Sequence, residues 1–327
     1  MTIFKGGNPL GSKNHMAVYS KQLSWSRKAR IGLTITSAVA LYHFSPALAN
    51  SDTKKLQNLI SNQVVSSAVD KTRILLRPGF NQLDINISGG ENLKPEGEIT
   101  GLRAYDNGGE ASSFIFNQIG LNSFDGRTTL NLGVGYRSLS DDDKWMFGAN
   151  LFYDHEFPND HQRYGTGLEM LSSAVKLSTN MYKGISDYKK DKSGIESKAL
   201  DGVDAKLELS LPYMPGTKLT YKSFKWDGID GASDIKGNTV GLKGYVTDSL
   251  LLEAGRTDFT GNSSTSSRNE VRVSYKIRLG DTSTRKVHQI SEKAYELLPL
   301  GNERYEPVER ENRIIKQKKF AATVSGV

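Results

Sequence analysis

Two acid–histidine pairs frame a short loop in the middle of the chain and offer the residue types of acid–base chemistry. They are Asp154–His155 before the loop and Asp160–His161 after it. In a hydrolase an Asp orients an imidazole that activates a serine, and Ser123 is a candidate nucleophile. Adjacent residues of a strand point to opposite faces of the sheet, so Asp154 is poorly placed to orient His155. We therefore expect a solvated loop without catalytic residues, and a membrane hydrolase is only the third of the functional alternatives.

Metal and cofactor sites find no better support in the sequence. The chain has no cysteine, which excludes thiolate metal centres, cysteine nucleophiles and disulfides. Asp141–Asp143 fall in a predicted tight turn, and the acidic stretch from Asp227 fails the EF-hand pattern because its third position is Ile229. Gly133 and Gly165 each begin a Gly-x-Gly inside a predicted strand with no helix after it, which favours close approach of bulky neighbours or of a threaded chain over phosphate binding. No cofactor and no metal are expected.

The basic character of the protein is concentrated in its first residues. The formal net charge is +7, and residues 1–49 contribute +6 of it because they contain no acid. This distribution removes the main support for a nucleic-acid partner, and none is expected. The basic stretch is followed by an apolar run over 31–41 and then by Ala47-Leu48-Ala49, which is the order of a secretory signal. We predict a signal peptide over 1–49, cleaved between Ala49 and Asn50.

Beyond the leader, the hydrophobic period changes once. Leu56, Leu59, Ile60 and Val64 lie at helical spacing and predict an amphipathic helix within a periplasmic segment over 50–80. From Asn81 onward apolar residues alternate with charged residues or glycine, which is the period of half-buried strands. Twelve strands are predicted, near 82–88, 97–106, 111–121, 127–137, 144–155, 164–171, 174–184, 202–211, 216–226, 238–246, 249–258 and 268–278.

Strand length and loop parity distinguish a membrane barrel from a soluble sandwich. Most predicted strands approach the roughly 9–11 residues of a tilted spanning strand, and their number is even. Alternate connections are tight, and the others are mostly long, at 89–96, 156–163, 185–201, 227–237 and 259–267. Short periplasmic turns and long outer loops are typical of outer-membrane barrels, and strands in lipid must close because no water satisfies an open edge. The predicted fold class is an all-β membrane protein, with a 12-stranded antiparallel transmembrane β-barrel over 81–279.

Three ordered stretches of the predicted strands also resemble a known family. Gly120–Arg137, Trp145–His155 and His161–Glu169 are similar to the translocation barrel of the inverse autotransporters, the family of intimin and invasin. The similarity runs from about Leu56 to the stretch Arg304–Ile315, which resembles the linker that follows the barrel in that family. The resemblance implies a 12-stranded barrel, a periplasmic N-terminal segment and a C-terminal passenger threaded outward through the pore.

Two departures from the family pattern limit what the resemblance implies. The predicted mature N-terminus leaves no room for the peptidoglycan-binding module that some relatives carry. The sequence also ends at Val327, about where the exported adhesin domains would begin. The family's adhesive function resides in those domains, so the expectation here is a translocator with almost nothing fused to it.

The 47 residues after Gly280 lose the strand alternation and form a pore linker or rudimentary passenger over 280–327. Ile290, Ala294 and Leu297 predict a short helix around 288–298, and the rest is polar. A barrel of about 12 strands is wider than barrels whose interior is filled by side chains and narrower than those with an open channel. A polar segment of 47 residues is large enough to plug such a pore. A periplasmic extension is the alternative. By family resemblance the pore-linker residues are Arg304, Tyr305, Val308, Arg310, Asn312 and Ile314.

The inner face of the predicted barrel carries charges of both signs. Such charges must be hydrated, which would suit a passing polypeptide, or paired with each other and with the tail, which would close the barrel. Both arrangements stay open, and in the hydrated one Asn131 faces water. The expected pore-lining residues are Arg137, Asn150, Glu169, Asp204, Lys206, Glu208, Lys243, Glu253, Arg272, Lys276 and Arg278.

The expected function is translocation across the outer membrane of a Gram-negative bacterium, of the chain's own C-terminal segment or of a separately encoded passenger. The second alternative is a structural or surface-binding barrel, an adhesin remnant that acts through outer loops such as Tyr188–Gly194. The expected partners are outer-membrane lipid and lipopolysaccharide, the barrel assembly machinery with periplasmic chaperones, and an exported protein or a host surface receptor.

Overall fold

The computed structural model describes residues 79–90, 93–191, 194–247, 249–260, 266–278 and 291–319. The predicted signal peptide with its Ala49–Asn50 cleavage site, and the amphipathic helix predicted between Ser51 and Asp70, lie outside the described residues. In the described ranges, no helix is long and apolar enough to span a membrane.

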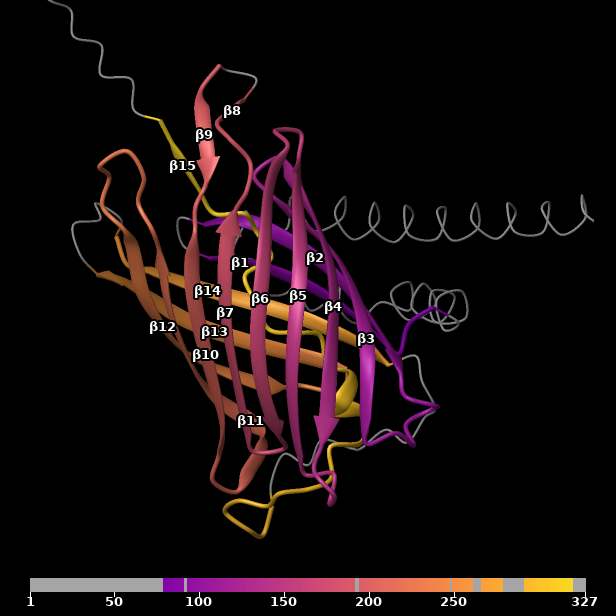
Figure 1. Ribbon diagram of the computed structural model, residues 1–327. Helices are drawn as coiled ribbons and strands as arrows, with labels where there is room; N and C mark the ends of the chain where they lie inside the picture. Colours follow the sequence, from indigo (N-terminus) through magenta and orange to yellow (C-terminus); the bar gives the residue numbers. More distant parts are fainter. Residues whose placement is uncertain are drawn as a thin grey trace, which may run out of the picture. The chain divides into compact units, whose positions relative to one another are not determined.

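Twelve antiparallel strands close into a barrel, as predicted from the alternation (Figure 1). Neighbours in sequence pair with each other, and the first strand pairs with the last to close the sheet. No edge is left open, which satisfies the backbone within the sheet. The barrel strands are β1 (Gln82–Gly90), β2 (Leu93–Tyr105), β3 (Ser113–Phe124), β4 (Arg127–Leu139), β5 (Trp145–Phe157), β6 (His161–Ser172), β7 (Val175–Gly184), β10 (Gly202–Leu211), β11 (Met214–Trp226), β12 (Ile235–Tyr245), β13 (Leu250–Thr260) and β14 (Arg268–Arg278).

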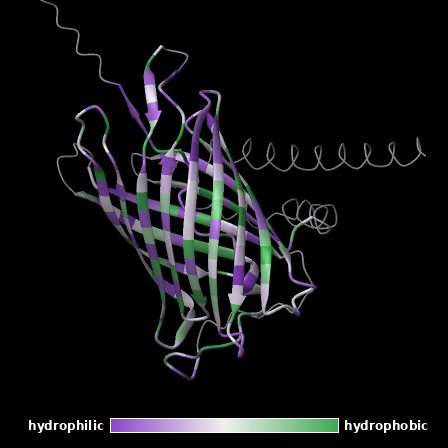
Figure 2. Ribbon diagram, in the orientation of Figure 1, coloured by the Kyte–Doolittle hydropathy of each residue, from purple (hydrophilic) through white to green (hydrophobic). Residues whose placement is uncertain are grey.

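Side chains alternate between the two faces of the barrel wall, as the strand period requires. In β4, Leu132, Val134 and Tyr136 point outward and are 41%, 56% and 51% exposed, whereas Asn131 and Arg137 point inward and are buried. Figure 2 shows the same alternation of hydrophobic and hydrophilic residues along the barrel strands. The predicted facing is therefore confirmed in this strand.

The connections at one end of the barrel are shorter than predicted. We call this end the loop rim and the opposite end, where β2 turns into β3 and β4 into β5, the turn rim. At the loop rim only 185–201, 227–234 and the segment from Thr260 to Arg268 are long. Between β5 and β6, for example, three residues suffice, because Asp160 adopts a positive φ and the strands run further than predicted. The prediction of five long loops was wrong for 89–96 and 156–163.

The longest loop carries a small sheet of its own. Residues 185–201 contain β8 (Lys189–Lys190) and β9 (Glu196–Ala199), and β9 pairs with β15 (Lys316–Lys318) near the end of the described chain. Figure 1 shows this sheet standing above the barrel at the loop rim. The segment before β15 passes through the barrel and includes the short 3₁₀ helix η1 (Gly301–Tyr305).

The helix predicted around 288–298 is wrong for its described part. Residues 291–298 form bends and irregular backbone. Their polar backbone groups bind the turn rim instead of each other: the amide of Ser291 donates to the Tyr213 carbonyl, and the amide of Tyr213 donates to the Ala294 carbonyl. Docking against the barrel thus overrides the apolar spacing of this segment.

Replacing Leu132 by arginine is expected to destabilise the barrel by about 2–4 kcal/mol, because this outward side chain would place a cation in lipid. The measurement is the heat resistance of the folded form on a denaturing gel. Asn131 is no neutral control, although a water-filled lumen would tolerate arginine there. It is 1% exposed and donates to Asp154 and to the Asn312 carbonyl. Ser88→Arg, on the border of an interior cavity, is the better control, and equal losses from the two variants would contradict the facing.

Candidate functional site

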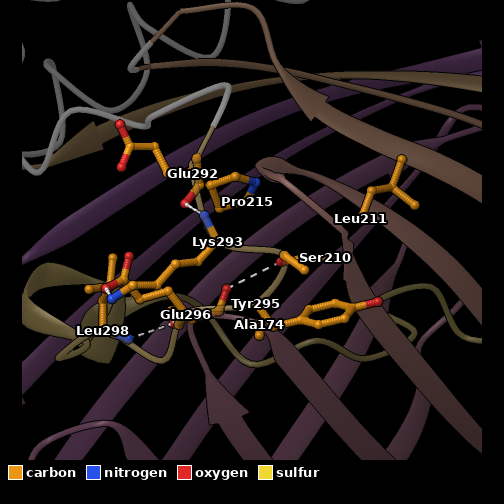
Figure 3. Close-up of a pocket in the computed structure, with 12 residues that line it drawn as sticks. Ala174, Ser210, Leu211, Pro215, Glu292, Lys293, Tyr295, Glu296 and Leu298 are labelled. Atoms are coloured by element: carbon orange, nitrogen blue, oxygen red, sulfur yellow. Dashed lines mark hydrogen bonds and ion pairs between the residues drawn. The ribbon is translucent and has the colours of Figure 1, made fainter.

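The candidate site is the barrel interior together with the segment 300–315 inside it, which we call the linker. The chain reaches the linker along the turn rim. Ser173, between β6 and β7, donates to the Glu296 carbonyl and accepts from the Leu298 amide. Residues 291–296 and Leu298 line a pocket of about 350 Å³ together with Ala174, Ser210 and Pro215 (Figure 3). The approach to the barrel is thus guided by hydrogen bonds to two turns.

An apolar cluster holds the linker just inside the turn rim. Leu300, Tyr305 and Val308 are at most 7% exposed and pack among side chains from β2 to β6. Their partners are Leu102, Ala104, Phe114, Phe116, Leu139, Met146, Phe152 and Leu171. The alternation predicted an inner face of charge and glycine, so this apolar patch was not expected. Burial of these side chains stabilises the seated linker and excludes water from this end.

Two glycines of β4 make room for the rings of this cluster. A Cβ atom on Gly133 would lie 2.3 Å from the Phe152 ring, and one on Gly135 would lie 2.3 Å from the Phe116 ring. The Gly-x-Gly pattern was expected to admit bulky neighbours, and these contacts confirm it. In β6, Gly165 similarly lets Arg310 of the linker approach, since a Cβ there would lie 2.9 Å from the guanidinium.

Buried ion pairs position the first turn of the linker. Arg137 donates to Glu169 through Nε at 2.7 Å and Nη2 at 3.0 Å, and its Nη1 donates to the Arg304 carbonyl at 2.7 Å. Arg304 donates to the Gly109 carbonyl in the β2–β3 turn. The Tyr305 hydroxyl donates to Asp106 in the same turn at 2.6 Å. A buried arginine is favourable only when its donors are satisfied, so the paired Arg137 prefers a linker carbonyl at this position.

A second buried cluster centres on Asp154, close to the loop-rim end of β5. Arg310 donates to both carboxylate oxygens of Asp154, at 2.9 and 2.7 Å, and Arg163 donates to the same group at 2.9 Å. Asn131 adds a fourth hydrogen bond to Asp154 at 2.7 Å, and the Arg310 guanidinium lies 4.1 Å from the Phe152 ring centroid. The carboxylate of Asp154 thus fixes the position and orientation of the Arg310 guanidinium, because the pair is bidentate.

The acidic residues of the linker face a wall of lysines. Glu306 accepts from Lys276 at 2.8 Å and from Lys176 at 3.3 Å. Glu309 accepts from Lys206 at 3.0 Å. Two residues further, Glu311 accepts from Lys222 at 3.3 Å. The linker therefore presents carboxylates to β7, β10, β11 and β14, and arginine to the acid of β5.

Barrel side chains also satisfy the linker backbone, which has no strand partner between Glu306 and Ile315. The Val308 amide donates to Gln118, and the Glu311 amide donates to the Tyr182 hydroxyl. Linker carbonyls accept from three further interior side chains, Asn131, Arg163 and Asn180. Of these five positions, Asn131 was predicted to face the lumen. Gln118, Arg163, Asn180 and Tyr182 were not predicted, although their inward register in β3, β6 and β7 could have found them.

The linker fills one side of the barrel and leaves a cavity of about 410 Å³ on the other. The cavity is bordered by β1, β2 and β11–β14, and by linker residues 306–313. Its lining is charged and includes Glu96, Glu98, Glu253 and Arg272. Paired charges thus surround the linker, and a cavity with a charged lining lies next to it.

The structure places most predicted site residues on the inner face of the wall or in the linker. Lys206 lies within 3.4 Å of Glu208 and 3.1 Å of Glu253, and Lys243 lies 2.7 Å from Glu208. Glu253 and Arg272 are half-buried, and the side chain of Arg278 lies outside the described residues. The other predicted residues are buried: Arg137, Asn150, Glu169, Asp204, Lys206, Glu208, Lys243 and Lys276 in the wall, and Arg304, Tyr305, Val308, Arg310, Asn312 and Ile314 in the linker.

A second apolar cluster closes around the linker at the loop rim. Tyr182, Leu200 and Trp226 are buried there, and Ile315 packs against them. The Leu200 amide donates to the Ile315 carbonyl at 2.9 Å. The linker is therefore held by apolar contacts at both ends and by charge in the middle.

The acid–histidine pairs do not form a catalytic triad. Asp154 points inward to arginines, whereas His155 points outward and lies 3.2 Å from Asp160. His161 Nε2 lies 3.0 Å from the Ser197 hydroxyl, while its buried Nδ1 has no hydrogen-bond partner to act as the orienting acid. Among the described residues, no cluster of three acidic or histidine side chains could hold a metal ion.

Comparison with known proteins agrees with this architecture. Residues 36–312 match the β-domain family of the inverse autotransporters. Invasin of Yersinia enterocolitica is 28% identical over 196 residues, covering 58% of this chain and 22% of invasin. Intimin of Escherichia coli O127:H6 is 27% identical over 250 residues, covering 73% of this chain and 26% of intimin. The chain thus spans about a quarter of the length of these two relatives.

A solved structure shows the same fold. A chain from a study of the in-meso crystallization of membrane proteins superposes with a TM-score of 0.62 at 21% identity, covering 73% of this chain and 99% of that chain. The matched family, the closed 12-stranded sheet and its apolar outer face lead to one assignment. This chain belongs to the inverse autotransporter family and is an outer-membrane β-barrel of the translocator type.

Proposed function

We propose that this barrel carries the C-terminal part of its own chain across the outer membrane and keeps the linker in the pore afterwards. One observation carries the proposal: the linker runs from Leu300, whose amide binds Asp143 at the turn rim, to β15, which pairs with β9 beyond the loop rim. A periplasmic extension would have no reason to meet matching charges at Asp154 and at Lys206 along the way. A passenger following Lys319 would start outside the barrel.

In this function the two sets of predicted residues have different roles. The wall residues Arg137, Glu169 and Lys206 pair with each other or with the linker and so select its register. The linker residues Arg304 and Arg310 are the groups that this register brings to their partners in the barrel. The leader over 1–49, cleaved between Ala49 and Asn50, directs export, and residues 50–80 stay in the periplasm.

The proposed partners follow from the surfaces of the barrel. The apolar outer face contacts outer-membrane lipid, including lipopolysaccharide, and folding requires the barrel assembly machinery with periplasmic chaperones. An exported protein or a host surface receptor would meet the loop rim. Catalysis forms no part of the proposed function.

A cysteine at position 325 tests the direction of the tail. Ser325→Cys should react with a membrane-impermeant maleimide on intact cells, because the linker already exits at β15. The natural chain has no cysteine, so the label reports this position alone. Asp142→Cys in the β4–β5 turn is the matched control and should react only after the outer membrane is broken. Labelling of position 325 only in broken cells would refute export of this segment.

A further inference from the structure

We propose that two outer loops form an exit clamp that captures the exported chain as an added strand as it leaves the pore. The clamp consists of the hairpin 185–201 and the loop 227–234, and its ligand is an extended polypeptide, here residues 315–319. The inference rests on the proposed function, because it assigns these loops to the segment that is exported.

Main-chain pairing is the first part of the clamp. Register pairs join Lys316 to Ala199 and Lys318 to Ser197, and the Lys319 amide donates to the Glu196 carbonyl at 2.8 Å. Such pairing recognises the backbone of an extended chain, independently of most of its side chains. The hairpin therefore offers an edge that accepts a strand.

A side-chain amide supplies the second part. Gln317 Nε2 donates to the Ile229 carbonyl at 2.9 Å, and Gln317 Oε1 accepts from the Ile229 amide at 3.3 Å. This pair of hydrogen bonds has the donor–acceptor pattern of a strand pair and binds the emerging chain to the loop 227–234. The chain is thus bound by both loops just beyond the apolar cluster at the loop rim.

Tyr188 joins the two loops to the end of the described chain. Its hydroxyl donates to Asp230 of the loop 227–234, and this hydrogen bond raises the pKa of Tyr188 to about 12. Lys198 of β9 and Lys319 lie 5.7 and 5.0 Å from the centroid of the Tyr188 ring. Contacts between a cation and an aromatic face are attractive at these distances.

The clamp gives export a preferred end state. Contacts that form only after a segment has passed the loop rim stabilise the exported position and oppose return into the pore. Lys316 marks the point where the chain leaves the pore, since its ammonium still donates to the buried Glu156 of the barrel wall at 2.7 Å. The backbone of the same residue already pairs with Ala199, so the chain passes from the barrel wall to the hairpin at Lys316.

A designed disulfide tests the strand pairing in the full-length protein on cells. Ser197→Cys with Lys318→Cys places two cysteines directly opposite each other, within the roughly 7 Å Cα separation that a disulfide allows. Lys189→Cys with Lys318→Cys is the matched control. Lys189 of β8 and Lys318 of β15 lie on opposite sides of β9, which separates them by two strand spacings, about 9.6 Å. Under mild oxidation the first pair should form the linked peptide about tenfold more than the control, by mass spectrometry. Equal yields would overturn the clamp.

Hydrogen exchange on the purified full chain tests the role of Gln317. Gln317→Ala should speed amide exchange at residues 316–319 by about tenfold, because two hydrogen bonds to Ile229 are lost. Lys318→Ala, an exposed neighbour, should leave it unchanged. Equal exchange in the two variants would refute the assigned role. Failure of the clamp leaves the Ser325→Cys variant labelled on intact cells, whereas failure of the proposed function abolishes that labelling.

Discussion

Asp154→Ala is expected to lower the stability of the folded barrel by about 3–5 kcal/mol, the usual cost of removing one partner from a buried ion pair. Asp154 is fully buried and accepts hydrogen bonds from Arg310, Arg163 and Asn131. Its removal leaves two guanidinium groups in the interior without their carboxylate. Because Arg310 belongs to the linker, the variant should also loosen the linker in the pore.

The denaturant midpoint of the purified barrel and the heat resistance of its folded form on a gel measure this loss. Asp258→Ala is the matched control, because Asp258 pairs with Arg256 on the exposed outer side of β13, and the midpoint should not move. Asp154→Asn should fall between the two, since it keeps the shape and loses the charge. A midpoint for Asp154→Ala equal to that of the control would show that Asp154 does not hold the linker.

A stop codon after Gly280 is expected to raise the single-channel conductance several-fold and to admit large antibiotics to the cell. The truncation removes the linker while β1–β14 remain, so the cavity of about 410 Å³ becomes continuous with the space that the linker filled. The ion preference should change as well. Lys176, Lys206, Lys222 and Lys276 lose the glutamates that they contact, so the open barrel should favour anions.

The matched control for this experiment is a stop codon after Lys319. This variant keeps the linker and β15 and should conduct like the full-length chain. Planar bilayers measure conductance and reversal potential, and growth in the presence of large antibiotics measures permeability in cells. An unchanged conductance after the Gly280 stop would mean that the linker does not occupy the pore in the membrane.

Which residues face outward could be predicted from the sequence because the period of a strand is local. Leu132, Val134 and Tyr136 alternate with polar neighbours whatever their partners, and the structure exposes all three. The closed sheet followed from the same pattern, since strands in lipid have no other way to satisfy their edges. Strand ends were less predictable, because a turn of positive-φ residues such as Asp125–Gly126 lets the strands run to its edge.

The tertiary structure alone decided what the inward residues do. Asp154 is one more acid in the sequence, and only barrel closure brings Arg163 of β6 and Arg310 of the linker to it. The linker has no hydrophobic repeat from which its path could be predicted, because its backbone hydrogen bonds go to side chains of strands distant in sequence. The sequence by itself determined the wall of this protein through short-range alternation, and long-range contacts, which carry no local pattern, determined how the interior is filled.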